Sequence, residues 1–199
     1  MEDLHLLDQS PPERRDAARN RGALLEAAQE LLDDSGVESL TMDAVAQRAG
    51  VGKGTLFRRF GSRKGLMGAV LDLFEREFQQ SVLFGPPPLG PGAAPWDRLV
   101  AFGESRLRHN LRQAELIRAA GYPGIGNTAT FSFSSLHVQV LLRELGVTGD
   151  LDYLASALIA PLELRVFRPS EEDQPAQRAA HAGWTELARR IVVADSGGE

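Results

Sequence analysis

The 199-residue chain contains no cysteine. This absence excludes disulfide bonds, thiol catalysis and cysteine-based zinc sites, and it fits a reducing compartment, so we expect a cytoplasmic protein. No segment approaches the roughly 20 consecutive apolar residues that a membrane-spanning helix requires, and we expect no membrane partner. The first residues carry more acidic than basic groups and no long apolar stretch, which argues against a secretory signal peptide.

Recognisable catalytic constellations are also missing. The sequence has neither an HExxH nor a GxSxG motif, and its four histidines are scattered at His5, His109, His137 and His181. The segment Gly50–Thr55 superficially resembles a phosphate-binding loop, but a glycine separates Lys53 from Thr55 and no strand precedes it. We therefore expect no enzyme, no bound metal and no cofactor.

Lysine is scarce, with two residues against twenty arginines, and the net charge is −5. The charge is unevenly distributed, because six basic and no acidic residues lie between Gln47 and Lys64, which leaves −11 for the remainder. A small basic patch on an acidic chain can hold phosphates locally while discouraging non-specific binding. A charge run taken alone is more often a solvated face, so the patch needs further support.

Apolar residues recur at helical spacing along the whole chain, and alternating strand patterns are absent except at Thr128–Phe133, which we assign to a helix start. Residues 1–13 are predicted to be a disordered tail, and 85–95, with five prolines and three glycines, an exposed loop. The predicted helices span about 14–35, 42–49, 53–60, 62–80, 96–111, 113–120, 128–145, 151–167 and 174–193.

Two of these helices, 42–49 and 53–60, are short and joined by a tight turn that contains glycine, the pattern of a helix-turn-helix unit. Thr41 is a good N-cap for the first, and Leu40 and Val45 occupy the positions of a hydrophobic staple. In the second, Leu56 and Phe60 are four residues apart and should pack inward against Val45 and Ala49.

The opposite face of the second helix is then free to enter a major groove. Arginine can bind guanine O6 and N7 in a bidentate manner, so Arg58 and Arg59 are the candidates for base reading. Gly52 and Gly54 remove side chains at the helix N-terminus, where backbone N–H groups can approach a phosphate closely. The predicted DNA-binding residues are Thr41, Arg48, Lys53, Gly54, Thr55, Phe57, Arg58, Arg59, Arg63 and Lys64.

The run from Ala46 to Phe60 (AQRAGVGKGTLFRRF) closely resembles the N-terminal domain of the TetR/AcrR family of repressors. The resemblance includes Leu40-Thr41-Met42 before this run and Ser62-Arg63-Lys64-Gly65-Leu66 after it. The resemblance covers roughly Arg19–Phe78. It implies a subunit of nine or ten helices, homodimerisation through the last two, and a ligand pocket in the C-terminal domain. The sequence departs from the family pattern at Gly52, where serine is usual, and at Phe57, where a phosphate-contacting tyrosine is usual.

The C-terminal part offers candidates for both of these implied features. Aromatic and polar side chains that could line a pocket are Phe102, Arg106, His109, Tyr122, Phe131, Phe133 and His137, although each aromatic taken alone is more often part of a core. Apolar stripes on the last two predicted helices supply interface candidates at Leu154, Leu158, Leu162, Trp184, Leu187, Ala188 and Ile191. The alternative for the stripes is that they face only the subunit's own core.

We therefore expect an all-α protein with a helix-turn-helix DNA-binding domain at 14–61 and a ligand-binding and dimerisation domain at 62–199, in which 62–80 is the connecting helix. The predicted function is that of a transcriptional regulator, a repressor released from double-stranded, palindromic operator DNA by an unknown small-molecule effector. A homodimer is expected, because two half-sites one helical turn apart, about 34 Å, require two linked recognition helices. The alternative is a helical protein-interaction module without an effector, whose basic patch meets acidic protein surfaces.

Overall fold

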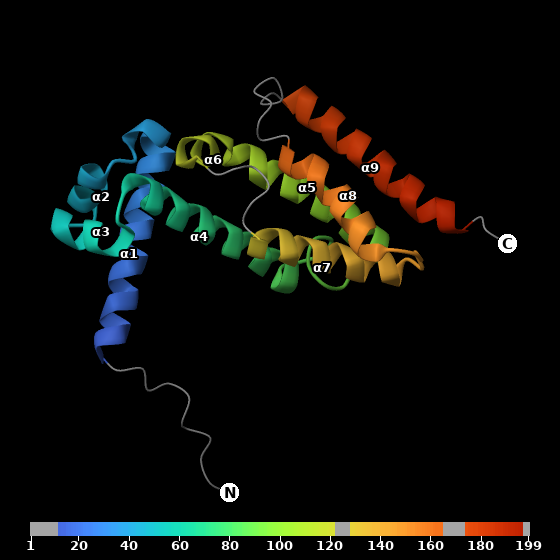
Figure 1. The fold of residues 1–199 in the computed structure, drawn as a ribbon, viewed down its shortest axis with the longest axis horizontal. Helices are drawn as coiled ribbons and strands as arrows, with labels where there is room; N and C mark the ends of the chain where they lie inside the picture. The colour runs from blue at the N-terminus through green and yellow to red at the C-terminus, as the bar shows by residue number, and fades with distance from the viewer. Residues whose placement is uncertain (1–11, 122–127, 165–173, 197–199) are drawn as a thin grey trace, which may run out of the picture. The chain divides into compact units, whose positions relative to one another are not determined.

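The computed structural model describes residues 12–121, 128–164 and 174–196. Within these ranges the chain is helical and contains no strand, which confirms the all-α prediction (Figure 1). No helix among them is both long and apolar enough to cross a bilayer. The chain divides into two compact units, residues 1–73 and 74–199, which are described separately below.

The first unit begins with α1 (Pro12–Ser35), a short 3₁₀ turn at Val37–Ser39, α2 (Met42–Arg48) and α3 (Lys53–Phe60). α4 (Arg63–Phe84) starts in this unit and continues into the second. Local signals set these boundaries, as the sequence predicts. The Thr41 hydroxyl accepts a hydrogen bond from the Ala44 amide at 3.1 Å, and the Ser62 hydroxyl accepts one from the Gly65 amide at 3.1 Å.

The core of the first unit packs against the inner side of α2 and α3. Both staple residues, Leu40 and Val45, are fully buried, and so is Leu56 of α3. Gly61 ends α3 with a φ of 73°, a conformation that side chains disfavour. α3 is thus held as a short helix whose inner face is fixed by packing.

The second unit contains the C-terminal turns of α4 with α5 (Pro95–Arg112), α6 (Ala114–Ala120), α7 (Thr128–Glu144), α8 (Leu151–Leu164) and α9 (Gln174–Ser196). α7 and α8 lie side by side, and α5 packs against α7, α8 and α9 (Figure 1). The fully buried residues Phe102, Leu142, Leu158 and Ala188 bring α5, α7, α8 and α9 into one core.

The expected element order matches the observed one, with differences at the ends. Residues 12 and 13 belong to α1 rather than to a tail, and residues 1–11 lie outside the described ranges. α4 runs to Phe84, four residues beyond the predicted end, because Val82 is fully buried and keeps the helix against the second core. Pro95 starts α5 instead of closing the loop. α8 is described to Leu164, so the predicted end at Phe167 lies outside the described residues.

The division between the compact units also differs from the predicted domain boundary at residue 61. Arg63, in the first turn of α4, donates hydrogen bonds to the carbonyl oxygens of Leu40 and Val37, each at 2.8 Å. These bonds attach the start of α4 to the first unit, and the compact units separate only at residues 73 and 74.

Candidate nucleic-acid interface

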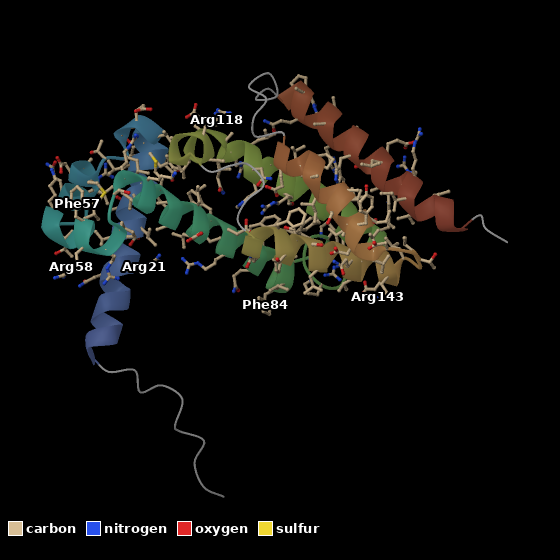
Figure 2. The ribbon with its side chains drawn as sticks, viewed as in Figure 1. Arg21, Phe57, Arg58, Phe84, Arg118 and Arg143 are labelled. Atoms are coloured by element: carbon tan, nitrogen blue, oxygen red, sulfur yellow. The ribbon has the colours of Figure 1, made fainter. Side chains whose placement is uncertain are left out.

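α3 presents a basic and partly aromatic surface to solvent. Leu56 is buried on its inner side, whereas Arg58 and Arg59 are exposed. Phe57 keeps 42% of its surface accessible, and Figure 2 labels both Phe57 and Arg58 at α3. The two predicted base-reading arginines are therefore outside the core, as a DNA-reading role requires.

The N-terminal end of α3 is open to close approach. A side chain at Gly54 would meet no atom within 4 Å, so the glycine leaves bare backbone on the exposed side of the helix. Lys53 is exposed beside it, and its ammonium pairs with the Asp43 carboxylate at 2.6 Å. Thr55 is half-buried and Lys64 is exposed, while Thr41 is exposed and caps α2.

Two predicted DNA contacts, Arg48 and Arg63, have structural partners that the sequence did not indicate. Arg48 binds Glu30 at 3.0 Å and Asp34 at 3.1 Å, which ties α2 to α1. The hydrogen bond that Arg48 donates to Glu30 raises the pKa of its guanidinium most, and the hydrogen bond to Asp34 raises it further. Arg63 holds the two carbonyl groups described above. Both side chains position helices, and contact with a phosphate would compete with these bonds.

Residues 24–70 match the profile of the family described as bacterial regulatory proteins, tetR family. A stretch of 71 residues is 39% identical to an HTH-type transcriptional regulator of Staphylococcus aureus (strain USA300), and the same identity is found in the regulator of strain NCTC 8325. Residues 24–70 therefore form an N-terminal domain of the tetR type. The aligned stretch covers 34% of this chain and 38% of each relative, so the chain matches little more than a third of the length of these relatives.

Similarity in fold extends over nearly the whole chain. A TetR-family transcriptional regulator from Pectobacterium atrosepticum has a TM-score of 0.69 at 20% identity, covering 92% of this chain and 96% of its own. The BioQ protein solved with its natural double-stranded DNA operator has a TM-score of 0.61 at 21% identity, covering 87% and 98%. At these identities the comparison establishes the TetR fold of both units.

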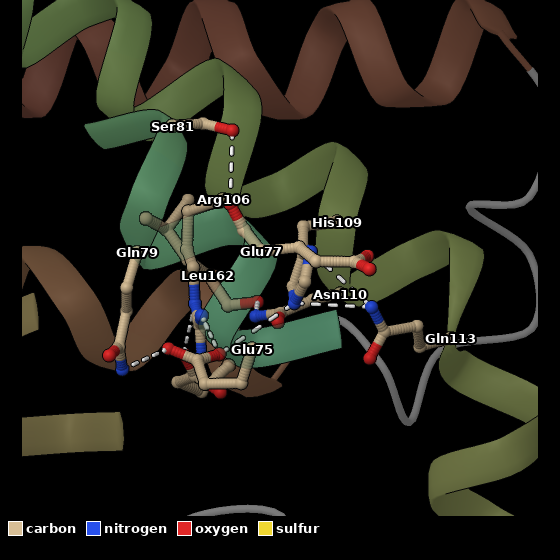
Figure 3. A network of polar contacts seen from close by, with 10 residues as sticks. Glu75, Glu77, Gln79, Ser81, Arg106, His109, Asn110, Gln113 and Leu162 are labelled. Atoms are coloured by element: carbon tan, nitrogen blue, oxygen red, sulfur yellow. Dashed lines mark hydrogen bonds and ion pairs between the residues drawn. The ribbon is translucent and has the colours of Figure 1, made fainter. Parts of the chain in front are cut away.

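Two of the predicted pocket residues, Arg106 and His109, contact other side chains of the second unit. Arg106 is 2% exposed and lies 2.6 Å from the carboxylate of Glu75 of α4 (Figure 3). It also pairs with the carboxylate of Glu163 of α8 at 2.9 Å. His109 lies 3.6 Å from Glu75, and its ring contacts Phe78 at a centroid distance of 4.9 Å. Arg106 is therefore bound to internal partners, and contact with a ligand would compete with these ion pairs.

This network also sets the ionisation of its members. Burial alone would raise the pKa of Glu75, but hydrogen bonding from His109 and the charge of Arg106 lower it below its usual value. Burial likewise disfavours the charged guanidinium, yet the Glu163 and Glu75 carboxylates raise the pKa of Arg106. The ion pairs bind α4, α5 and α8 together by charge as well as by packing.

Of the other predicted ligand contacts, those that the structure describes lie in or against the core of the second unit. Phe102 is fully buried, and its ring lies 5.1 Å from that of His137, so it is part of the core. Phe131 and Phe133 are half-buried against the same core, and Tyr122 lies outside the described residues. The pKa of His137 is lowered to about 4, mainly because the ring is buried and in smaller part because of the positive charge of Arg98. Its Nε2 and the hydroxyl of Ser134 have no hydrogen-bond partner.

A groove of about 630 Å³ opens elsewhere in this unit, between α5, α6 and α9. Leu107, Leu111 and Ala114 give it an apolar lining, and charged side chains of both signs complete it. None of the predicted ligand residues that the structure describes lines this groove. The sequence carried no signal for it, because the groove depends on how far α9 stands from α5 and α6.

Four of the seven interface candidates on α8 and α9 are buried within the subunit itself. Leu158, Leu162, Trp184 and Ala188 are at most 4% exposed and belong to the subunit's own core. The Trp184 indole donates a hydrogen bond to the Leu158 carbonyl at 2.7 Å, which fixes α9 on α8. Leu154 and Ile191 are half-buried against that core, and Leu187 remains 38% exposed.

Proposed function

We propose that this protein is a dimeric transcriptional regulator that binds double-stranded operator DNA through α3 and represses transcription until a small-molecule effector releases it. The observation that carries the proposal is α3 itself, whose Leu56 is fully buried while Arg58 and Arg59 face solvent. The TetR-type domain matched by residues 24–70 supports the same conclusion, as does the fold shared with BioQ, a protein solved on its operator.

Binding divides between two kinds of contact. Arg58 and Arg59 read base edges, since a guanidinium fits the O6 and N7 acceptors of guanine. Lys53 and Lys64 supply charge to the phosphates, and the uncovered backbone at Gly54 allows the duplex to approach the start of α3. On binding, the Lys53 ammonium exchanges Asp43 for a phosphate, because both are anionic partners within reach of a flexible side chain.

The dimer forms through the outer faces of α8 and α9. Their buried stripes are unavailable, but apolar side chains remain on the outside, with Tyr153 73%, Leu187 38% and Val193 59% exposed. Burying such residues removes apolar surface from water. Two subunits joined in this way present two copies of α3 to the half-sites of a palindromic operator.

The effector binds in the groove between α5, α6 and α9, whose volume falls in the usual range for small-molecule sites, about 300–1,000 Å³. Binding there displaces α5, and Arg106 of α5 carries the displacement to α4 through Glu75. Because α4 starts at Arg63, which is attached to the first unit, its movement changes the placement of α3. A coupling of about 1–3 kcal/mol, or 5–150-fold in operator affinity, is the usual scale.

The test is footprinting of the full-length protein on the DNA that flanks its own gene, followed by affinity measurements on the protected sequence. Arg58→Ala and Arg59→Ala should each weaken specific binding, by about 1–3 kcal/mol for an arginine that reads a guanine. Arg143→Ala, an exposed arginine of α7, is the matched control and should leave affinity unchanged.

Two outcomes would overturn parts of the proposal. Binding that shows no preference for any duplex sequence and fades steeply with salt favours the interaction module, because simple charge attraction behaves in this way. For the switching part, small molecules are screened against the protein–operator complex. Equal operator affinity with and without a compound shown to bind the groove refutes release by an effector.

A further inference from the structure

The exposed aromatic ring on α3 is unusual in the first unit. Of the large apolar side chains that the structure describes as exposed, Phe57 is the one that belongs to residues 1–73. Its ring is partly covered by the Lys53 ammonium, which lies 5.9 Å from the ring centroid. The fold therefore holds an apolar group on the surface proposed to meet DNA, next to Arg58.

The phenyl ring of Phe57 can make few kinds of favourable contact with a DNA duplex. A phenyl group has no hydrogen-bond donor, so it cannot bind a phosphate as a hydroxyl or an ammonium does. The edges of the bases in the major groove are read mainly through hydrogen-bonding groups, and the one apolar substituent among them is the C5-methyl group of thymine. Contact between this methyl group and an aromatic ring removes apolar surface of both from water.

The position of Phe57 on α3 allows such a contact. On a helix of 3.6 residues per turn, Gly54 and Arg58 lie opposite the buried Leu56, and Phe57 lies at the flank of that outer face. When the outer face points into the major groove, the flank faces the side of the groove. Lys53, one turn before Phe57 on the same flank, is then directed toward the phosphates.

We propose that the Phe57 ring packs against the C5-methyl group of one thymine in each operator half-site, and that the protein thereby selects thymine at that position. The inference rests on the proposed function, and it adds an apolar contact to the arginine contacts. The selection is for a methyl group, so uracil, which pairs identically but lacks the methyl, is the discriminating probe.

The experiment uses the full-length protein and the operator found by footprinting. Each thymine in the footprint is replaced singly by deoxyuridine, and dissociation constants are measured by fluorescence anisotropy. One methyl group buried against the ring corresponds to a loss of about threefold to fourfold. We expect such a loss at one thymine in each half-site, and a loss of about tenfold when both symmetry-related thymines are replaced.

Variants at Phe57 test whether the loss of affinity for the deoxyuridine operator depends on the phenyl ring. Phe57→Ala should bind the thymine and deoxyuridine operators equally, whereas Phe57→Leu, which keeps an apolar side chain, should retain part of the discrimination. Phe84→Ala removes another exposed phenylalanine, 75% accessible and in the second unit, and should discriminate like the wild type. Circular dichroism and thermal unfolding establish that each variant is folded.

Several results would overturn the inference without affecting the proposed function. One is specific operator binding in which no deoxyuridine replacement changes the affinity more than 1.5-fold, about the scatter expected of repeated titrations. Another is a methyl dependence that persists unchanged in both Phe57→Ala and Phe57→Leu, which would assign the methyl contact to a different residue. Failure of the wild type to select any duplex would instead refute the proposed function itself.

Discussion

Gly103 of α5 lies directly under the Trp184 ring of α9, and this contact gives a sharp test of the second core. A Cβ added at Gly103 would overlap three carbons of the Trp184 ring, Cζ3, Cε3 and Cη2. The ring cannot move away easily, because it is 4% exposed and its indole donates a hydrogen bond to the Leu158 carbonyl at 2.7 Å. Gly103→Ala must therefore displace α9 or break that bond.

The magnitude follows from three effects. Overpacking of a core costs about 1–3 kcal/mol. Loss of the indole hydrogen bond adds about 0.5–1.5 kcal/mol. Alanine regains about 0.5–1 kcal/mol over glycine within a helix. The net loss expected for Gly103→Ala is about 2 kcal/mol, and the melting temperature should fall by about 4–8 °C for a chain of this size.

The assay is equilibrium unfolding in urea, followed by tryptophan fluorescence and circular dichroism at one fixed protein concentration. Gly183→Ala is the matched control, because Gly183 precedes Trp184 in α9 and a Cβ there meets no atom within 4 Å. We expect this control to be neutral or slightly stabilising. If Gly103→Ala were as stable as Gly183→Ala, the ring would not be held in place and the reasoning would be refuted.

Three further predictions concern buried charge and the α3 surface. The pKa of His137 is lowered to about 4, so between pH 6.5 and pH 4 the unfolded chain takes up a proton at this residue and the folded chain does not. The free energy of unfolding is therefore unaffected by protonation of this residue above pH 6.5 and decreases as the pH falls toward 4. His137→Leu should therefore match the wild type at pH 7.5 in urea unfolding and exceed it by about 2 kcal/mol at pH 5; an equal pH dependence would contradict the shift. Arg106→Met leaves the carboxylates of Glu75 and Glu163 without their cation and should lower the free energy of unfolding by about 3–5 kcal/mol at pH 7, whereas replacing both carboxylates by Gln in the same variant should restore much of it. Gly54→Ala should stabilise α3 by about 0.5–1 kcal/mol while weakening operator binding, and unchanged affinity in titrations would show that the duplex does not approach this backbone.

The first unit was predictable because its determinants are local. The Thr41 cap, the staple of Leu40 and Val45, and the inward Leu56 are all encoded within a few residues, and the structure shows each in its expected place. The exposure of Arg58 follows from the same spacing, because a short helix with one buried face must turn the other outward. The assignment of these exposed residues to DNA contacts stays a prediction.

The second unit was less predictable because an apolar stripe does not reveal what covers it. Trp184 and Leu158 have the spacing of interface residues, yet each covers the other within one subunit. The indole bond to the Leu158 carbonyl joins residues 26 positions apart, so it depends on how α8 and α9 cross and not on any short pattern. The position of the α5–α6–α9 groove depends on the same tertiary arrangement.

The buried ion pairs of the second unit could not be predicted from local sequence. A buried arginine with no visible local partner suggests an anionic ligand, but Glu75 and Glu163 lie 31 and 57 positions away and supply the negative charge themselves. Separating Arg106 from either carboxylate would leave a buried charge unpaired, so α4, α5 and α8 resist moving independently. Glu75 is 12 residues from Arg63 on the same helix, roughly 18 Å at 1.5 Å per residue. Arg63, at the start of the same helix, donates hydrogen bonds to the carbonyl oxygens of Leu40 and Val37, so α4 has polar anchors at both of these positions.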